Sequence, residues 1–132
     1  MNYKEQAIKF FSKDIFATEA TGIIIDEVDE GYAKCHFDIL PHHLNADGVV
    51  MGGAIYTLAD FTFAVAANAG NPVTVSQSCN ITCHAPAKGK YLYAEAESIK
   101  SGKTTCFFIT KIYTDEKKHV ATLTSTGFRK IN

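Results

Sequence analysis

The chain has 132 residues, enough for one domain with a substantial core, and its 13 Lys and Arg nearly balance its 14 Asp and Glu. A formal net charge of −1 provides no basic surface for nucleic acid or an anionic membrane, so we expect neither as a partner. Residues 2–11 are too polar for a signal peptide and no apolar run is long enough to span a bilayer, so we expect a cytoplasmic protein.

The first predicted elements are a short helix and two strands. Residues 2–12 form an amphipathic pattern, and five side chains are expected to face the body of the protein, namely Tyr3, Ala7, Ile8, Phe10 and Phe11. Residues 14–21 are predicted to be irregular. A strand opens at Gly22, and Gly31 makes a hairpin turn into a second strand over residues 32–40, whose side chains alternate between apolar and polar.

The centre of the chain, from His42 to Asn71, predicts one long and almost wholly apolar helix. Gly52-Gly53 lets the backbone enter this helix, and Gly70 followed by Pro72 ends it. Asp60 is the only formally charged side chain between residues 47 and 88. Because burying a lone carboxylate is costly, this acid is the first candidate for function.

Helical spacing places a set of residues with Asp60 on one face of the predicted helix. Intervals of three and four residues put Gly53 about two turns before Asp60, together with Tyr56, Phe63 and Ala67. A helix that is apolar all round has to be covered on all sides. We therefore expect a curved sheet to wrap around it.

The second half of the chain predicts four strands in an antiparallel meander. They cover residues 73–85, 91–99, 104–114 and 119–128, with a charged or basic turn between each strand and the next. The first of them is rich in Val, Thr, Ser, Cys and Ile, which predicts a strand buried at least partly on both faces. Two strands, one helix and four strands indicate an α+β domain, a curved antiparallel sheet around one long buried central helix.

Several motifs together resemble the signature of the hotdog-fold acyl-CoA thioesterases, in the phenylacetic-acid-pathway (PaaI-like) branch of the 4-hydroxybenzoyl-CoA thioesterase-like superfamily. The motifs span about residues 20–130: Leu44-Asn45, Gly48, Gly52-Gly53-Ala54, Leu58-Ala59-Asp60, Asn68, Ser76 to Thr82, Pro86-Ala87-Lys88-Gly89, Ala94-Glu95-Ala96, Gly102-Lys103-Thr104 and Gly127-Phe128. The resemblance implies one hotdog domain over residues 1–132, with an N-terminal helix and lead-in at 1–20. It also implies hydrolysis of aryl- or medium-chain acyl-CoA by a homodimer or homotetramer whose sites lie between subunits.

Two residues of the central helix supply what thioester hydrolysis requires. A desolvated Asp60 is suited to act as general base or nucleophile, although it could instead be a buried acid satisfied by hydrogen bonds from Asn68, Thr57 or another strand. The amide of Gly53, at the helix N-terminus, is suited to stabilise an oxyanion, although Gly52 and Gly53 could simply serve the turn.

The resemblance implies roles for further residues. Asn45 would orient the substrate carbonyl or the water, although an isolated Asn is commonly a turn residue. Ser76 or Ser78 would hold the attacking water, and the pattern does not choose between them or exclude a core hydroxyl. The two basic turns would bind coenzyme A phosphates or be solvated, and they carry Lys88, Gly89, Lys90, Lys100 and Lys103. The remaining predicted contacts would line an aryl or a medium-chain acyl pocket, namely Met51, Gly52, Tyr56, Phe61 and Phe63.

Met51 is a departure from the family's pattern, which usually has His before the two glycines. Met cannot hydrogen-bond as His does, so we expect altered efficiency or substrate choice. A noncatalytic acyl-CoA or small-aromatic binding protein is the alternative. A hotdog hydratase is a third reading, but those sites resemble a His-plus-acid pair and the Gly53 to Asp60 face carries no His.

Metal and cofactor sites are not expected. The cysteines form no C-x-x-C pair and lie in predicted strands, which favours reduced, buried thiols over a disulfide or metal role at Cys35, Cys79, Cys83 and Cys106. His42, His43 and Cys83-His84 lack any zinc spacing. Coenzyme A would enter only as part of the substrate.

Overall fold

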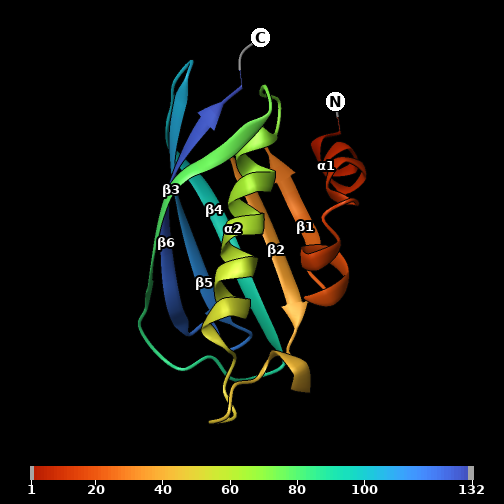
Figure 1. The fold of residues 1–132 in the computed structure, drawn as a ribbon, viewed down its shortest axis with the longest axis vertical. Coiled ribbons are helices and arrows are strands. Elements are labelled where there is room, and N and C mark those ends of the chain that lie inside the picture. Colours follow the sequence, from red (N-terminus) through yellow and green to blue (C-terminus); the bar gives the residue numbers. More distant parts are fainter. Residues whose placement is uncertain (1, 131–132) are drawn as a thin grey trace.

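A computed structural model describes residues 2–130 as one antiparallel sheet curved around a central helix (Figure 1). The strand order in the sheet is β1-β2-β4-β5-β6-β3. The elements in chain order are α1 (Tyr3–Phe11), a π-helical turn (Phe16–Ala20), β1 (Ile24–Asp29), β2 (Tyr32–Asp38), a 3₁₀ turn (Pro41–His43), α2 (Gly52–Asn68), β3 (Thr74–Cys83), β4 (Tyr91–Ser101), β5 (Thr105–Thr114) and β6 (His119–Arg129). The predicted hotdog architecture is confirmed.

The predicted alternation of β2 is confirmed and shows how the sheet meets α2. Ala33, Cys35 and Phe37 of β2 are fully buried, as are Leu92, Ala94 and Ala96 of β4. Because side chains of a strand alternate between faces, these positions form the face that packs on α2. On α2, the buried side chains include Leu58, Thr62 and Ala66, which follow one helical stripe.

Both ends of α2 follow the predicted signals. Met51 before the helix has an extended backbone, and Ala69 after it is again extended, with Gly70 in the left-handed region at φ 70°. The Asn68 side chain then joins the helix end to β3, because its Oδ1 accepts from Thr74 N at 2.8 Å and its Nδ2 donates to Thr74 O at 3.1 Å.

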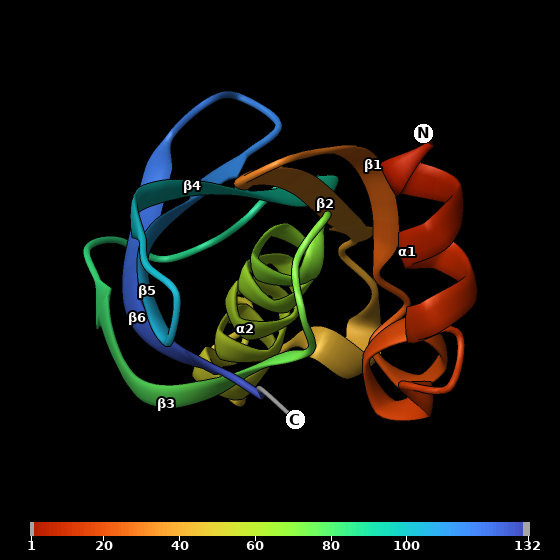
Figure 2. The same cartoon turned by 90° about the horizontal axis from the view of Figure 1, so that it is seen from above.

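The expectation that α2 would be covered on all sides is wrong for the single chain. Gly52, Gly53 and Tyr56 are exposed, and Asp60 and Ala64 are only partly buried. Figure 2 shows the reason: the sheet curves around one side of α2, and an uncovered side remains between β3 and the segment that follows α1. A sheet of six strands therefore leaves a lengthwise face of the helix open.

The prediction that the strand after the helix is buried on both faces is also wrong. In β3, only Thr74 is buried, and most residues from Val75 to Cys83 are exposed. The reason is topological, because β3 is an edge strand that pairs with β6 alone. The apolar and β-branched side chains of β3 are therefore left uncovered in a single chain.

The N-terminal helix packs through fewer side chains than predicted. Ala7 and Phe11 are buried, and Phe11 meets Phe61 of α2 edge to face at 5.4 Å. Ile8 and Phe10 point to solvent, with 48% and 57% of their surface exposed. A nine-residue helix on a flat neighbour buries only a narrow stripe, so this part of the prediction is wrong.

The segment predicted to be irregular contains the π-helical turn, which Thr21 N closes onto Phe16 O at 2.9 Å. Over residues 2–130, the helices are too short or too polar to cross a lipid bilayer.

Candidate active site

Asp60 lies in the middle of α2 on the face that the sheet leaves open. It borders a cavity of about 350 Å³, lined by residues 14–17 on one side and by α2 on the other, namely Tyr56, Thr57, Asp60, Phe61 and Ala64. Pockets for small ligands usually have about this size or more. The carboxylate is therefore half-buried but reachable from outside the chain.

The hydrogen-bond donors proposed to satisfy Asp60 are engaged elsewhere. The Thr57 hydroxyl donates to Gly53 O at 2.8 Å, and the Asn68 amide donates to Ala64 O and Thr74 O. Burial, followed by the negative charge of Asp14, raises the pKa of Asp60 above its ordinary value. Both effects disfavour the carboxylate, which makes it a stronger base than a solvated one.

The start of α2 carries backbone amides that point out of the helix. Ala54 N and Ile55 N donate to Met51 O, whereas the Gly53 N–H precedes this first turn and has no acceptor among residues 2–130. Neither Gly52 nor Gly53 has a left-handed backbone, and a Cβ added at either would meet no atom within 4 Å. The chain's own turn does not need glycine there, so the reading in which both serve only the turn loses its support.

Asp60 and Gly53 are too far apart to act on one carbonyl within a single chain. They are seven residues apart on α2, which corresponds to about 10 Å along the helix axis at 1.5 Å per residue. An oxyanion donor and a base that attack the same carbon have to lie within hydrogen-bond reach of it. Asp60 and the Gly53 amide are therefore two candidate half-sites that cannot serve one carbonyl within a single chain.

Asn45 shapes the loop before α2. Its Oδ1 accepts from Asp47 N at 2.9 Å and from Val49 N at 3.2 Å, which makes it the side chain that closes this turn. This role as a turn residue is the structural alternative that the sequence raised to a role of Asn45 in orienting the substrate. The turn brings Leu44 opposite Val50 in an isolated bridge, so the loop returns on itself before the helix begins.

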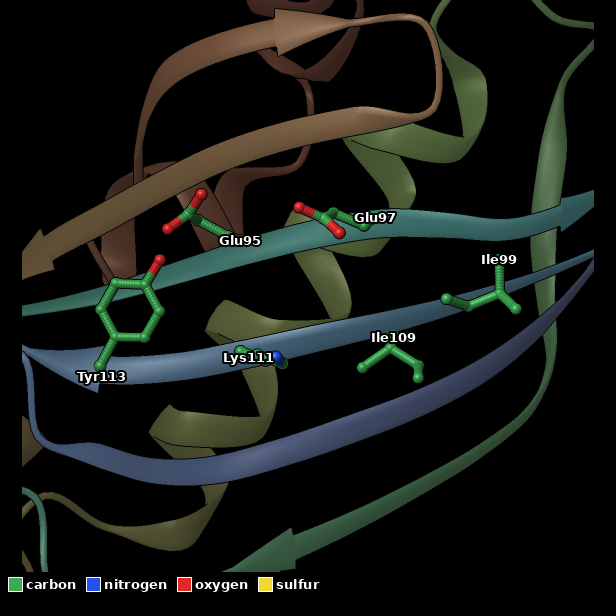
Figure 3. Close-up of a pocket in the computed structure, with 6 residues that line it drawn as sticks. All are labelled: Glu95, Glu97, Ile99, Ile109, Lys111 and Tyr113. Carbon is green, nitrogen blue, oxygen red and sulfur yellow. The ribbon is translucent and has the colours of Figure 1, made fainter.

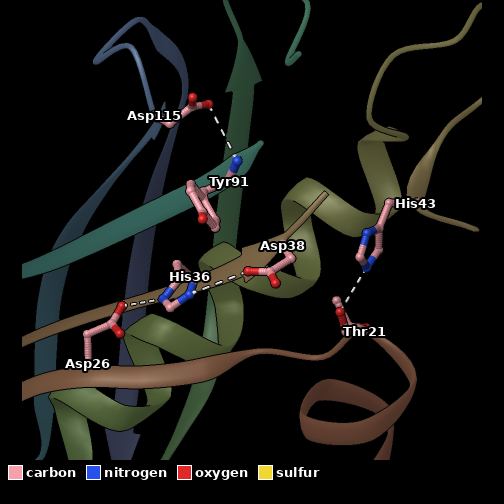
Figure 4. Close-up of polar contacts among 7 residues, drawn as sticks. All are labelled: Thr21, Asp26, His36, Asp38, His43, Tyr91 and Asp115. Atoms are coloured by element: carbon pink, nitrogen blue, oxygen red, sulfur yellow. Dashed lines mark hydrogen bonds and ion pairs between the residues drawn. The ribbon is translucent and has the colours of Figure 1, made fainter. Parts of the chain in front are cut away.

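His43 anchors the same loop, a role that sequence reasoning missed. Its Nδ1 accepts from Leu40 N at 2.9 Å, so the proton is on Nε2, which donates to Thr21 O at 2.8 Å (Figure 4). Its ring stacks on Phe37, and its carbonyl accepts from Met51 N at 2.8 Å. Burial is the main cause that lowers the pKa of His43 and keeps the ring neutral. The sequence signal for this anchoring role was the pair of consecutive histidines, His42-His43, next to apolar residues.

Met51 stands directly before α2 with 56% of its surface exposed. Its side chain makes no hydrogen bond to the helix start. The Met51 side chain therefore gives the Gly53 amide no hydrogen bond. Gly52, next to it, is exposed as well.

Of the three aromatic residues predicted to line the pocket, the structure brings Tyr56 and Phe61 to the cavity but not Phe63. Tyr56 lines it one turn before Asp60, and burial is the first cause that raises the pKa of its phenol to about 12. Phe63 is buried in the core, where it meets Phe108 edge to face at 5.4 Å. An interval of three residues from Asp60 turns Phe63 toward the sheet, whereas Ala64, at an interval of four, stays on the open face.

Ser76 and Ser78 lie on the exposed edge strand β3, so neither is a core hydroxyl in this chain. In a strictly alternating strand both hydroxyls would point to one face. The pairing of β3 with β6 shifts between them, because Ser76 faces Gly127 and Ser78 faces Thr126. The irregularity falls at Gln77 and breaks the simple period of two.

The two basic turns do not form one cluster. Val50 N donates to Ala87 O at 3.1 Å, which places the Lys88-Gly89-Lys90 turn beside the loop that leads into α2. Lys100 and Lys103 lie at the other end of β4, about 33 Å away at ~3.3 Å per residue. Within one chain, Lys88 and Lys103 therefore cannot hold the same phosphates.

Asp115 holds the first of these turns in shape. Its Oδ1 accepts from Lys90 N at 3.0 Å and from Tyr91 N at 3.4 Å (Figure 4). Slight desolvation acts against ionisation, but these backbone hydrogen bonds outweigh it and lower the pKa of Asp115. The same carboxylate lies against Gly89, where φ is 126° and a Cβ would come within 2.3 Å of Oδ1.

A second hollow, of about 320 Å³, lies on the other face of the sheet (Figure 3). Its lining comes from β4 and β5: Glu95, Glu97, Ile99, Ile109, Lys111 and Tyr113. Glu95 and Glu97 alternate with the buried alanines of β4, and the three β5 residues alternate with buried residues of β5, so these side chains point away from α2. The hollow shares no residue with the surroundings of Asp60. On this outer face His36 also pairs with Asp26 at 2.7 Å (Figure 4).

Within residues 2–130, no three His, Cys, Asp or Glu side chains gather in a way that could hold a metal ion. The open face of α2 itself presents the Asp60 carboxylate and, at its start, the backbone amide of Gly53.

Comparison with known proteins identifies a family and relatives for this chain. Residues 47–121 match the model of the thioesterase superfamily. The acyl-coenzyme A thioesterase PaaI of Escherichia coli K12 is 33% identical over 104 residues, which cover 78% of this chain and 74% of that protein. A putative esterase of Archaeoglobus fulgidus is 34% identical over 104 residues, covering 78% of this chain and 68% of the other.

A solved structure of E. coli PaaI, from the phenylacetic acid degradation operon, has the same fold. It superposes with a TM-score of 0.91 at 27% identity, covering 98% of this chain and 95% of that one. The chain therefore belongs to the thioesterase superfamily, as a PaaI-like thioesterase of hotdog fold.

Proposed function

We propose that the protein hydrolyses acyl-CoA thioesters to a free acid and coenzyme A, with no cofactor beyond the coenzyme A that the substrate carries. The observation that carries this proposal is Asp60, a half-buried carboxylate with a raised pKa that borders a ligand-sized cavity on the open face of α2. The relationship to E. coli PaaI supports coenzyme A thioesters as the substrate class.

In the proposed reaction, Asp60 takes a proton from water as the water oxygen attacks the thioester carbon. The carbonyl oxygen gains negative charge, and the N–H of Gly53 stabilises it at the positive end of α2. The C–S bond then breaks, and the coenzyme A thiolate leaves and is protonated. If Asp60 attacks directly, a mixed anhydride forms and water hydrolyses it. Single-turnover hydrolysis in ¹⁸O-water separates the routes, since only the anhydride route can leave ¹⁸O in Asp60.

We propose that the working unit contains at least a homodimer. The exposed edge of β3 can pair with a second β3, and this places the open face of one α2 against another. An antiparallel pair of α2 helices brings Asp60 of one subunit toward Gly53 of the other, which closes the gap between the half-sites. A homotetramer would be two such pairs.

Coenzyme A phosphates are proposed to bind at the Lys88-Gly89-Lys90 turn. The turn lies beside the loop that leads to Gly53, through the Val50 to Ala87 hydrogen bond. Lysine ammonium groups suit phosphate as compact charges. Lys103, at the far end of β4, could contribute only from another subunit.

The test is release of free thiol from a panel of acyl-CoAs by the wild type and by Asp60→Asn. We expect the variant to lose at least about 100-fold in kcat, the usual scale for a catalytic base. Asp38→Asn, an exposed carboxylate on the outer face of the sheet, is the matched control and should keep wild-type rates. Equal rates for the wild type and Asp60→Asn would refute the assignment, and saturable binding without turnover would favour the noncatalytic alternative.

A further inference from the structure

The cavity beside Asp60 has one wall from outside α2. This wall is the lead-in, defined as residues 14–17 between α1 and the π-helical turn. Ile15 and Phe16 are apolar, yet 53% and 70% of their surfaces are exposed. Apolar side chains left uncovered next to a reactive group are a surface that a ligand can cover.

The charges around the cavity all have one sign. Asp14 and Asp60 both line it, and its other lining residues are uncharged. Lys9 and Lys13 line a neighbouring hollow over α1, which shares Asp14 with the cavity but does not include Asp60. Two ion pairs occur among residues 2–130, both of them at His36, and Asp14 takes part in neither. Apolar walls with two carboxylates favour an uncharged ligand and repel an anionic one.

We propose that the acyl group of the substrate occupies this cavity and that Asp14 is a specificity-determining residue, which excludes acyl groups ending in a carboxylate. The substrates are then coenzyme A thioesters of uncharged, apolar acids, and half-thioesters of dicarboxylic acids are rejected. Ile15 and Phe16 cover the acyl group opposite Tyr56. This inference rests on the proposed function and deepens it.

The electrostatic repulsion between the Asp14 and Asp60 carboxylates supports this arrangement. After burial, the charge of Asp14 is the second cause that raises the pKa of Asp60. The other titratable group facing Asp60 is Tyr56 on the same helix, whose phenol also interacts with Cys79 of β3. A negative acyl terminus in the cavity would meet the same repulsion that Asp60 already meets from Asp14.

The experiment compares butyryl-CoA with succinyl-CoA, whose acyl groups have equal length but end in a methyl and a carboxylate. For the wild type we expect kcat/KM to favour butyryl-CoA by about tenfold or more. Asp14→Asn is nearly isosteric, and it should raise the relative kcat/KM for succinyl-CoA about tenfold while butyryl-CoA changes little. Glu19→Gln is the matched control, because it removes a nearby exposed carboxylate that does not line the cavity.

A second readout separates Asp14's charge from a merely structural role. The base form of Asp60 is the active one, so kcat/KM for butyryl-CoA falls as pH drops through the raised pKa of Asp60. Asp14→Asn removes one cause of that rise, so the acid limb should move to lower pH. Glu19→Gln should leave the limb in place.

The covering role of the lead-in has its own variant. Phe16→Ala should lower kcat/KM for octanoyl-CoA about tenfold relative to acetyl-CoA, because a large apolar contact with the longer chain is lost. Phe107→Ala, an exposed Phe on the outer face of β5, should not change this ratio.

The inference is overturned if the wild type hydrolyses both four-carbon substrates equally well. It is also overturned if Asp14→Asn has the same ratio of kcat/KM for succinyl-CoA to kcat/KM for butyryl-CoA as the wild type. Either result leaves the proposed function standing. Failure of the wild type to release thiol from any acyl-CoA overturns the proposed function instead. In that case thermal stabilisation decides the inference: butyryl-CoA should stabilise the wild type more than succinyl-CoA, and Asp14→Asn should remove the difference. Equal stabilisation of the wild type by both would overturn it.

Discussion

Gly53 illustrates how one residue can be understood only from what surrounds it. In the sequence, a glycine pair before a helix indicates a tight turn, which glycine serves through its conformational freedom. In the structure, Gly53 has an ordinary backbone and open space where a Cβ would stand. No neighbour within the chain requires the absent side chain, and we infer that glycine leaves room for a group that approaches from outside.

This reading predicts that Gly53→Ala changes stability and activity in opposite directions. Replacing a helical Gly by Ala should raise the free energy of unfolding by about 0.5–1 kcal/mol, because the unfolded chain loses freedom. The added methyl group should lower kcat with acyl-CoA by crowding the carbonyl. Urea denaturation and steady-state kinetics on the same preparation check both effects.

Gly70→Ala is the matched control. Gly70 has φ 70°, and a Cβ there would come within 2.9 Å of the Tyr3 hydroxyl, so the variant should lose stability. A Gly53→Ala variant that is also less stable than the wild type would contradict the outside approach and return Gly53 to a role in the turn.

At the scale of elements, α2 is held at both ends by side chains from elsewhere in the chain. The loop before it depends on His43, which joins it to Thr21 and Met51. The end of α2 depends on Arg129 of β6, which is buried, with 2% of its surface exposed. Its guanidinium donates to Ala67 O at 3.0 Å and Thr74 Oγ1 at 2.8 Å, near the negative end of the helix dipole.

Arg129→Met is therefore expected to lower the free energy of unfolding by about 2–4 kcal/mol, since it leaves buried acceptors unpaired. Lys130→Met, at the next residue, is exposed and should change stability little. Denaturant unfolding followed by circular dichroism measures both. Equal stability of Arg129→Met and the wild type would show that water replaces the guanidinium without cost.

At the scale of the whole molecule, the two half-sites predict complementation between inactive variants. Co-purified heterodimers of Asp60→Ala and Gly53→Val should recover up to about half of the wild-type activity, because one of their two sites combines two unmodified residues. The corresponding homodimers should stay inactive. Light scattering of the wild type should give at least twice the mass of one 14.4 kDa chain.

Heterodimers without activity, from variants that still associate, would place a complete site within one chain. An active monomer would have the same consequence.

Local residue patterns were sufficient for most of the architecture. The bounds of α2, the alternation of β2 and the order of two strands, one helix and four strands follow from periodicity and turn chemistry, which act over a few residues. Asp60 was identified in the same way, because one charge in an apolar run is costly wherever the run is buried.

Only the tertiary structure decided which surfaces are covered and which residues lie close together. It left β3 and one face of α2 open, turned Phe63 into the core, separated Lys88 from Lys103 and brought Asp14 beside Asp60 across 46 residues of sequence. These are relations between segments that are distant along the chain. The sequence by itself determined the period and chemistry of each segment, but neighbours are set by how a twisted sheet closes around a helix, which no local period encodes.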